Sequence, residues 1–222
     1  MNELLTREAQ PQSWQPRRPN RLVLRATDGD ELPIDPSRWH GPTSPAEQEM
    51  LDRLRGPVLD VGCGPGRIVE RLVRRGIIAL GVDPAPGAVS LARRRGCPVL
   101  QRSVFEPLPG EGRWRSVLLL DGNVGIGGDP LRLLQRCRSL VHDRGDVVVE
   151  AQRPGTGMRT CRARLERASE HSAWFAWSVV AVDALPVVAG QAGLRLVGVE
   201  STDNDRWFAH LTVDRRPARG DS

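Results

Sequence analysis

The 222-residue sequence contains neither lysine nor tyrosine, so all 32 of its basic residues are arginines. These absences exclude Schiff-base chemistry on a lysine and acid or base catalysis by a tyrosine. No stretch approaches the roughly 18–20 consecutive apolar residues that a membrane-spanning helix needs. The N-terminus also lacks the apolar stretch of a secretory signal peptide. We therefore expect a cytoplasmic protein with no membrane partner.

Cysteine is scarce and is not arranged in a way that serves a metal or a disulfide framework. The four cysteines are Cys63, Cys97, Cys137 and Cys161. None forms a Cys-x-x-Cys pair, and none has a histidine nearby, so the usual spacing of zinc ligands is missing. We expect four reduced thiols and no bound metal.

The length suits one compact domain with a sizeable core. With 32 basic and 27 acidic residues the formal net charge is +5. Groups of arginines at 71–75 and 93–95 fall on separate predicted helices, opposite their apolar sides. Such scattered charge is typical of solvated helix surfaces and does not by itself predict a nucleic-acid-binding surface.

From residue 57 onward, predicted strands and helices alternate along the chain. Apolar runs predict strands over 58–61, 77–82, 98–104, 116–120 and 147–149, and helical periodicity predicts helices over 67–75, 87–95 and 130–141. This alternation predicts an α/β fold with a doubly wound, mostly parallel seven-stranded sheet and helices on both faces. A helix over 183–192 and two strands, 194–200 and 206–213, complete it. The turn between those strands predicts an antiparallel hairpin, so the last strand of the sheet is antiparallel.

A glycine-rich turn follows the first of these strands, in the segment Asp60-Val61-Gly62-Cys63-Gly64-Pro65-Gly66. Glycines let the backbone approach a ligand closely, and the start of the next helix offers unpaired N–H groups. Asp83 ends the next strand, where a carboxylate can accept hydrogen bonds from a ribose diol. Arg67 stands where a dinucleotide-binding Gly-x-Gly-x-x-Gly fingerprint needs its third glycine, which disfavours a nicotinamide-dependent oxidoreductase.

The spacing Asp-x-Gly-x-Gly-x-Gly resembles the first motif of the class I S-adenosylmethionine-dependent methyltransferases. The resemblance implies S-adenosylmethionine as the cofactor, with Asp60 orienting the loop or the methionine amine and Asp83 holding the ribose. Many members carry an acid near the adenine amine, whereas this chain has Ser103 and Val104 there. The predicted cofactor site consists of Asp60, Gly62, Cys63, Gly64, Gly66, Asp83, Pro84, Ser103, Val104, Asp121 and Gly122.

The resemblance also implies a division of the chain. We expect a disordered arm over 1–20, an N-terminal lid over 21–56, a methyltransferase catalytic domain over 57–215 and a disordered tail over 216–222. Within the lid, Ser44, Pro45 and Glu47 form a capping-box pattern that predicts a helix over 45–55. Residues 155–180 show no clear periodicity, and we interpret them as irregular.

The fourth strand leads into Asp121-Gly122-Asn123, which should face the cofactor and the acceptor, because ligands bind at the carboxyl ends of parallel strands. We predict an acceptor pocket with Asn123 at its floor and walls formed by Trp39, His40, Trp174 and Trp177. The candidate catalytic residues are Asn123, His171 and His40.

The implied function is methyl transfer to a small-molecule acceptor, for which positioning matters more than a strong base. Two alternatives stay open. The net charge and an isoelectric point near 10.0 suggest an RNA methyltransferase; a non-catalytic, cofactor-binding regulatory protein is the other. Base methylation is disfavoured, because Val124-Gly125 follows Asn123 where amino methyltransferases of adenine and cytosine carry Pro-Pro-aromatic.

Overall fold

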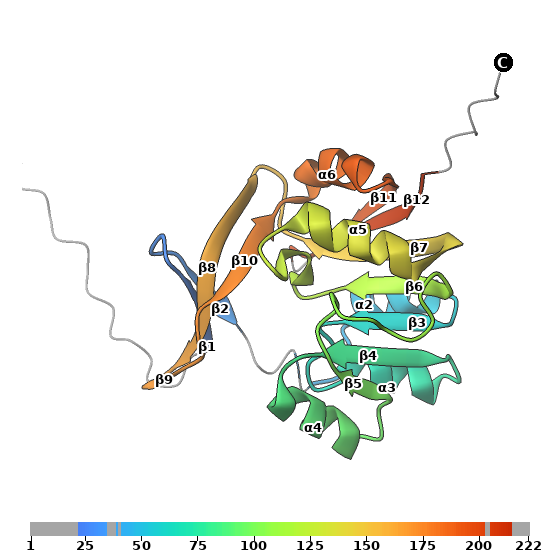
Figure 1. The fold of residues 1–222 in the computed structure, drawn as a ribbon, viewed down its shortest axis with the longest axis horizontal. Coiled ribbons are helices and arrows are strands. Elements are labelled where there is room, and N and C mark those ends of the chain that lie inside the picture. The colour runs from blue at the N-terminus through green and yellow to red at the C-terminus, as the bar shows by residue number, and fades with distance from the viewer. Residues whose placement is uncertain (1–21, 35–38, 40, 203–204, 215–222) are drawn as a thin grey trace, which may run out of the picture.

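The computed structural model describes residues 22–34, 39, 41–202 and 205–214. Its largest element is a seven-stranded sheet, seen at the right of Figure 1. In spatial order its strands are β11 (Leu194–Ser201), β12 (Trp207–Val213), β7 (Val141–Ala151), β6 (Trp114–Leu119), β3 (Val58–Val61), β4 (Ala79–Asp83) and β5 (Val99–Gln101). Strands β3 to β7 are parallel, and β12 is antiparallel to both β7 and β11. The predicted fold class, including the antiparallel last strand, is confirmed.

Helices cover both faces of this sheet. One face packs against α2 (Pro45–Asp52), α3 (Arg67–Arg74) and α4 (Pro86–Arg94), and the other against α5 (Pro130–Leu140) and α6 (Leu185–Gln191). Short 3-10 turns lie at η1 (Asn123–Gly125) and η2 (Val182–Ala184). Side chains alternate across a strand, so Leu59 and Val117 join the core under α5 and α6, whereas Val58 and Leu118 join the core under α2 to α4. Each core consists mainly of apolar side chains, as the uninterrupted apolar strands predict.

The helix starts follow the capping residues of the sequence. At α2 the Glu47 N–H donates to Ser44 Oγ (3.2 Å), and the Ser44 N–H donates to Glu47 Oε2 (2.7 Å), which completes the capping box. At α5 the Asp129 carboxylate accepts from the Arg132 N–H at 3.0 Å. These bonds satisfy N–H groups that lack partners within the helix.

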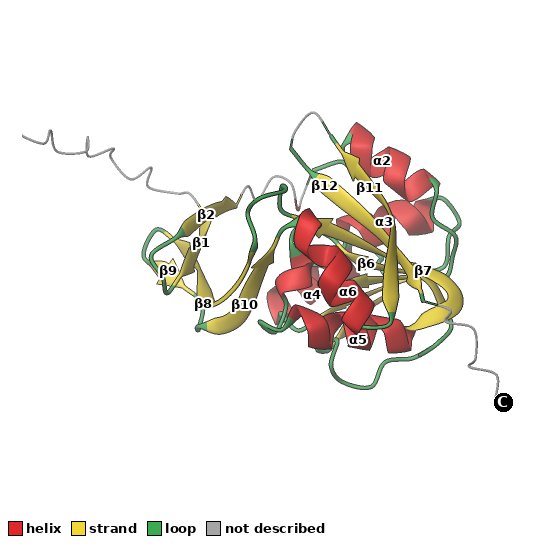
Figure 2. Cartoon of the chain, turned by 90° about the horizontal axis from the view of Figure 1, so that it is seen from above, coloured by secondary structure: helices red, strands yellow, loops and turns green. Residues whose placement is uncertain are grey.

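A second sheet stands beside the first, at the left of Figures 1 and 2, and we call it the accessory sheet. Its strands are β10 (Phe175–Val180), β8 (Met158–Arg167), β1 (Leu22–Ala26) and β2 (Glu31–Ile34), with β9 (Glu170–His171) paired to β8. Two predictions are therefore wrong: residues 155–180 are largely strands, and the segment from 22 to 34 is a β-hairpin rather than part of a helical lid. The predicted arm over 1–20 and tail over 216–222 lie outside the described residues.

The sequence signal for the accessory sheet is an alternation of period two. In β8, apolar Cys161, Ala163 and Leu165 alternate with charged Arg162, Arg164 and Glu166. The antiparallel register pairs Leu24 with Leu165 and Phe175 with Ala163, so one face of the sheet collects the apolar side chains. Such alternation is typical of an antiparallel sheet with one buried face. The accessory sheet therefore has a distinct apolar face.

The two sheets meet where β10 passes the η1 turn. Ile126 forms an isolated bridge with Trp177, and Thr160 Oγ1 donates to the Gly128 carbonyl at 3.1 Å. A Cβ built on Gly125 would lie 2.0 Å from the Ser178 carbonyl oxygen. The absence of a side chain at Gly125 is thus what lets the two backbones touch. Among the described residues, no helix is long and apolar enough to cross a membrane.

We expect Gly125→Ala to lower the free energy of unfolding by about 1–3 kcal/mol, because β10 must move away from η1 to admit the methyl group. Gly190→Ala is the matched control, because a Cβ there meets nothing within 4 Å and Gly190 lies inside α6. That control should be neutral or stabilising by up to about 1 kcal/mol. Urea unfolding of both variants checks this. Equal stability of the two would contradict the close approach.

Candidate functional site

A cleft of about 1020 Å³ lies where the carboxyl ends of β3, β4, β6 and β7 face the accessory sheet. Its floor is formed by the glycine loop after β3, the Asp121–Asn123 turn after β6 and the last residues of β7. Its opposite wall comes from β1, β8 and β10 of the accessory sheet. Ligand pockets usually occupy about 300–1,000 Å³, so this cleft lies at the upper end of their range.

The glycine loop is held from two sides by side chains. Asn123 Nδ2 donates to the carbonyls of Val61 (2.9 Å) and Gly62 (3.0 Å). On the other side, the Asp83 carboxylate accepts from the N–H groups of Gly64 (2.9 Å) and Ala85 (2.8 Å). The loop takes positive φ angles at Gly62 (71°) and Gly64 (52°), which favour glycine. Asn123 reaches this loop because β3 and β6 are neighbours in the sheet.

Beneath the cleft lies a buried network of ion pairs. The Arg67 guanidinium donates to both Glu47 oxygens (2.7 and 2.8 Å), and Arg206 donates to both Glu150 oxygens (2.8 and 2.7 Å). Arg206 also reaches Glu47 at 2.8 Å, which joins the two pairs. The four residues are only 2–8% exposed. Both arginines lie 3.6 Å from the Asp121 carboxylate, so Asp121 connects the network to the cleft.

The network fixes the charge states of its members. Burial alone would raise the pKa of Glu47, but the hydrogen bond from Arg67, the charge of Arg206 and the Ser44 N–H outweigh it and lower that pKa to about 2. Burial opposes the charge of Arg206, yet hydrogen bonding to Glu150 and the two glutamate charges raise its pKa above the ordinary value. Glu47 and Arg206 are therefore ionised at neutral pH.

Asp60 has the opposite environment. It is buried at the end of β3 and lines the cleft. Burial, followed by repulsion from Asp121, raises the pKa of Asp60 to about 7, with a smaller opposing effect of Arg67 and a further increase from Asp83. An acid whose pKa is raised to about 7 by burial and by neighbouring carboxylates is ready to pair with a cation.

Cys63 also lines the cleft, in the middle of the glycine loop. Burial, together with the nearby charges of Asp60 and Asp83, raises the pKa of the Cys63 thiol far above its ordinary value. The thiol therefore stays protonated and is not a nucleophile. All four cysteines are free, as expected. Within the described ranges, no three histidine, cysteine or acidic side chains cluster in a way that could hold a metal.

The cleft gathers most of the residues that the sequence singled out. Those that line it are Trp39, Asp60, Gly62, Cys63, Gly64, Asp83, Pro84, Ser103, Asp121, Gly122, Asn123 and Trp177. Four predicted residues that the structure describes do not line it: Gly66, Val104, His171 and Trp174. Gly66 instead packs on α4, since a Cβ there would lie 3.0 Å from Ala92 Cβ. His171 is exposed in β9, and His40 lies outside the described residues.

The predicted wall at Trp174 is wrong. Its ring lies under the Arg164 guanidinium, 4.7 Å from it, on the charged face of the accessory sheet. Its neighbour Phe175 lines the cleft instead. Consecutive residues of a strand point to opposite faces, so a cluster of aromatic residues in sequence is divided between the two faces.

Sequence reasoning missed the network residues Glu47, Glu150 and Arg206. The sequence predicts Glu47 as part of the helix cap, and the structure shows this cap. The Glu47 carboxylate also accepts hydrogen bonds from Arg67 and pairs with Arg206. The sequence offers one weak indication of Glu150 and Arg206 as site residues. Glu150 lies near the end of the apolar strand β7, and Arg206 directly precedes the strand β12. Charged residues at the ends of buried strands lie where ligands bind in an α/β sheet.

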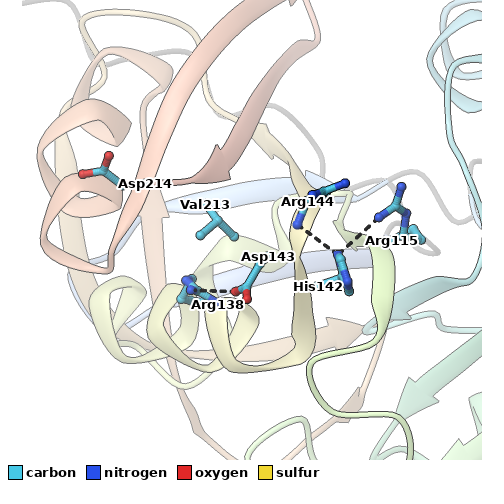
Figure 3. Close-up of a pocket in the computed structure, with 7 residues that line it drawn as sticks. All are labelled: Arg115, Arg138, His142, Asp143, Arg144, Val213 and Asp214. Atoms are coloured by element: carbon cyan, nitrogen blue, oxygen red, sulfur yellow. Dashed lines mark hydrogen bonds and ion pairs between the residues drawn. The ribbon is translucent and has the colours of Figure 1, made fainter. Parts of the chain in front are cut away.

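A second hollow, of about 730 Å³, lies at the opposite end of the strands (Figure 3). It is lined by Arg115, Arg138, His142, Asp143, Arg144, Val213 and Asp214. Arg138 pairs with Asp143 at 3.1 Å, and His142 Nδ1 accepts from the Arg144 N–H at 3.0 Å. This hollow is separated from the glycine loop by the length of β6 and β7, so it takes no part in the cleft.

Comparisons with known proteins agree with this geometry. Residues 58–145 match the model of a methyltransferase domain family. A ubiquinone biosynthesis O-methyltransferase from Azorhizobium caulinodans is 32% identical over 109 residues, which are 46% of this chain and 43% of that protein. The chain thus aligns with less than half the length of that relative.

Two solved structures share the fold across most of the chain. A SAM-dependent methyltransferase from Bacteroides fragilis, crystallised with S-adenosyl-L-homocysteine, gives a TM-score of 0.75 at 20% identity over 90% of both chains. The CcbJ methyltransferase from Streptomyces caelestis gives 0.62 at 16% identity, over 80% of this chain and 92% of that one. At these identities the similarity establishes the fold.

We expect Glu47→Gln to lower the free energy of unfolding at pH 7 by about 3 kcal/mol, because it removes the charge that Arg67 and Arg206 share. The pKa of Glu47 is lowered from 4.5 to about 2, so its ionised form stabilises the fold above pH 4.5 and loses that effect as the pH falls toward 2. The difference between wild type and variant should therefore shrink over that interval. Chemical unfolding between pH 2 and 7 measures it.

Glu49→Gln provides the control, because Glu49 lies on the same helix, is 69% exposed and pairs with Arg53. Its effect should stay within about 0.5 kcal/mol. If both variants lost the same stability, the buried network would not be the cause.

Proposed function

We propose that this chain, which carries a class I S-adenosylmethionine-dependent methyltransferase domain, transfers the methyl group of S-adenosylmethionine to a small-molecule acceptor. The observation that carries the proposal is the cleft, in which the glycine loop meets four carboxylates at the ends of neighbouring strands. These carboxylates belong to Asp60, Asp83, Asp121 and Glu150. Arg67 is the cationic side chain that lines the same cleft in the described part of the chain.

This charge distribution suits a cationic cofactor. The sulfonium and the methionine amine of S-adenosylmethionine are positive, and the carboxylates exceed the guanidiniums even when Arg206 is included. Asp83 already accepts from two backbone N–H groups, but each carboxylate oxygen keeps a second lone pair for a ribose hydroxyl. A Cβ built on Gly64 meets nothing within 4 Å, so the space beside the loop is open.

When bound, the cofactor supplies an activated methyl group with a neutral thioether as leaving group. The chain then has to align the acceptor and exclude water. We assign Asn123 the role of a positioning residue, because its side-chain amide holds the Val61 and Gly62 carbonyls. The accessory sheet supplies the wall that keeps water from the reacting atoms.

The small-molecule acceptor is preferred over RNA on geometric grounds. The arginines of the hollow in Figure 3 lie at the far end of the strands, where they cannot hold a nucleic acid over the glycine loop. The accessory-sheet side of the cleft carries no charged side chain among the described lining residues. A surface for RNA needs basic side chains next to the reaction site.

We expect S-adenosylhomocysteine to bind about tenfold more weakly at pH 6 than at pH 8. The pKa of Asp60 is about 7 in the ligand-free chain, so its carboxylate must lose a proton before it can pair with the methionine amine. Asp60→Asn should remove this pH dependence and weaken binding at pH 8. Isothermal titration calorimetry at both pH values measures it.

The same variant has an opposite effect on stability. Because the pKa of Asp60 in the folded chain lies above its ordinary value of 3.8, ionisation near pH 7 destabilises the ligand-free fold. Asp60→Asn should therefore raise the melting temperature of the ligand-free protein at pH 8. A variant that kept the tenfold pH effect on affinity would exclude Asp60 as the titrating group.

We expect incubation with methyl-labelled S-adenosylmethionine and a metabolite extract of the source organism to label a small molecule, identified by mass spectrometry. Asp83→Ala should abolish most of this labelling, because the loss of charge-assisted bonds worth about 1.5–3 kcal/mol weakens the loop and the ribose site ten- to a hundredfold. Label in the RNA fraction would contradict the small-molecule assignment. Tight cofactor binding without any labelled product would indicate a regulatory protein instead.

A further inference from the structure

We propose that the methyl acceptor is a flat, uncharged aromatic molecule that lies against the apolar face of the accessory sheet. The inference rests on the proposed function and names the acceptor class for the same cleft. It follows from three properties of the wall opposite the glycine loop: its apolarity, its lack of charge and its aromatic rings.

The apolar face is built by the strand register. Leu24 lies directly opposite Leu165, and Phe175 and Trp177 follow on the same side of β10, opposite Ala163 and Cys161. The cleft is lined by Leu24, Leu165, Phe175 and Trp177. An apolar surface of this kind binds a ligand by removing its apolar area from water, at about 25 cal/mol per Å². The acceptor therefore presents apolar area to this wall.

No charged side chain of the accessory sheet lines the cleft among the described residues. On the far face, Glu166 pairs with Arg25 (2.6 Å) and with Arg164 (2.6 Å). Within the described lining, every charged side chain belongs to the seven-stranded sheet, its loops or α3, and acids outnumber arginine there. A carboxylate or phosphate held against this wall would be desolvated with no cationic partner on the accessory-sheet side, and Asp121 and Glu150 across the cleft would repel it. The acceptor is therefore uncharged.

The rings favour an aromatic acceptor. Phe175 and Trp177 meet edge to face, with centroids 6.0 Å apart and planes at 79°. Trp39 adds a third ring from the segment before α2. Aromatic ligands gain about 0.5–1.5 kcal/mol per ring pair beyond the area they bury. The hydroxyl groups of this wall already have partners, since Ser172 Oγ donates to the Ala173 carbonyl (2.9 Å) and Ser178 Oγ lies 2.9 Å from Thr160 Oγ1.

The test compares three probes with the same fused two-ring carbon skeleton on protein saturated with S-adenosylhomocysteine. The probes are 2-naphthol, 6-hydroxy-2-naphthoate and decahydro-2-naphthol, which differ in charge or in flatness. Equilibrium dialysis should show that 2-naphthol binds at least tenfold more tightly than either of the others. Phe175→Ala and Leu165→Ala should each weaken 2-naphthol binding several-fold and leave S-adenosylhomocysteine affinity unchanged.

Trp174→Ala is the matched control, because this neighbouring ring stacks on Arg164 on the far face. It should leave 2-naphthol binding unchanged. Equal binding of the naphthoate, or equal losses in the Trp174 and Phe175 variants, would overturn the inference while the cofactor site stands. Failure of S-adenosylhomocysteine to bind at the outset would overturn the proposed function, and the inference with it.

Discussion

The buried ion pairs of Arg67 and Arg206 with Glu47 and Glu150 are the interaction on which the site depends. They join α2, α3, β7 and β12, four segments that are far apart in sequence and converge beneath the cleft. A guanidinium removed from water is costly unless its partners are in place, so these segments can come together in few other ways. The network thus fixes the position of Asp121 and, through it, the floor of the cleft.

The network also accounts for the electrostatics of the cleft. Two guanidiniums face three carboxylates, those of Glu47, Glu150 and Asp121, and Asp60 and Asp83 add further negative charge nearby. Burial and then repulsion from Asp121 raise the pKa of Asp60 to about 7. The site is therefore less stable empty than it is with a cation bound. Charged groups at a binding site commonly lower the stability of the ligand-free fold.

The two sheets contribute side chains of different chemistry to the cleft. The seven-stranded sheet supplies charge and the glycine loop, where a polar and cationic molecule fits. The accessory sheet supplies an apolar wall, and its ion pairs of Glu166 with Arg25 and Arg164 lie on the far face. Their contact at Gly125 and Ser178 is between backbones, so the distance between donor site and acceptor wall is set without long side chains. Such rigid spacing is what a transfer between two bound molecules requires.

The sequence by itself determined the seven-stranded sheet, its helices and the glycine loop, because each rests on local periodicity, a capping residue such as Ser44 or Asp129, or a turn that needs glycine. The contact of Asn123 with the Gly62 carbonyl follows from the neighbouring positions of β3 and β6, a strand order that the resemblance to the methyltransferase family implies. Tertiary structure alone decided the accessory sheet: β1 and β8 pair across 141 residues at Arg25 and Glu166, and local pattern does not identify so distant a partner. Local pattern likewise does not predict that Glu47 pairs with Arg206. Nor does it show that Phe175 rather than Trp174 lines the cleft, because strand register determines which face a side chain occupies.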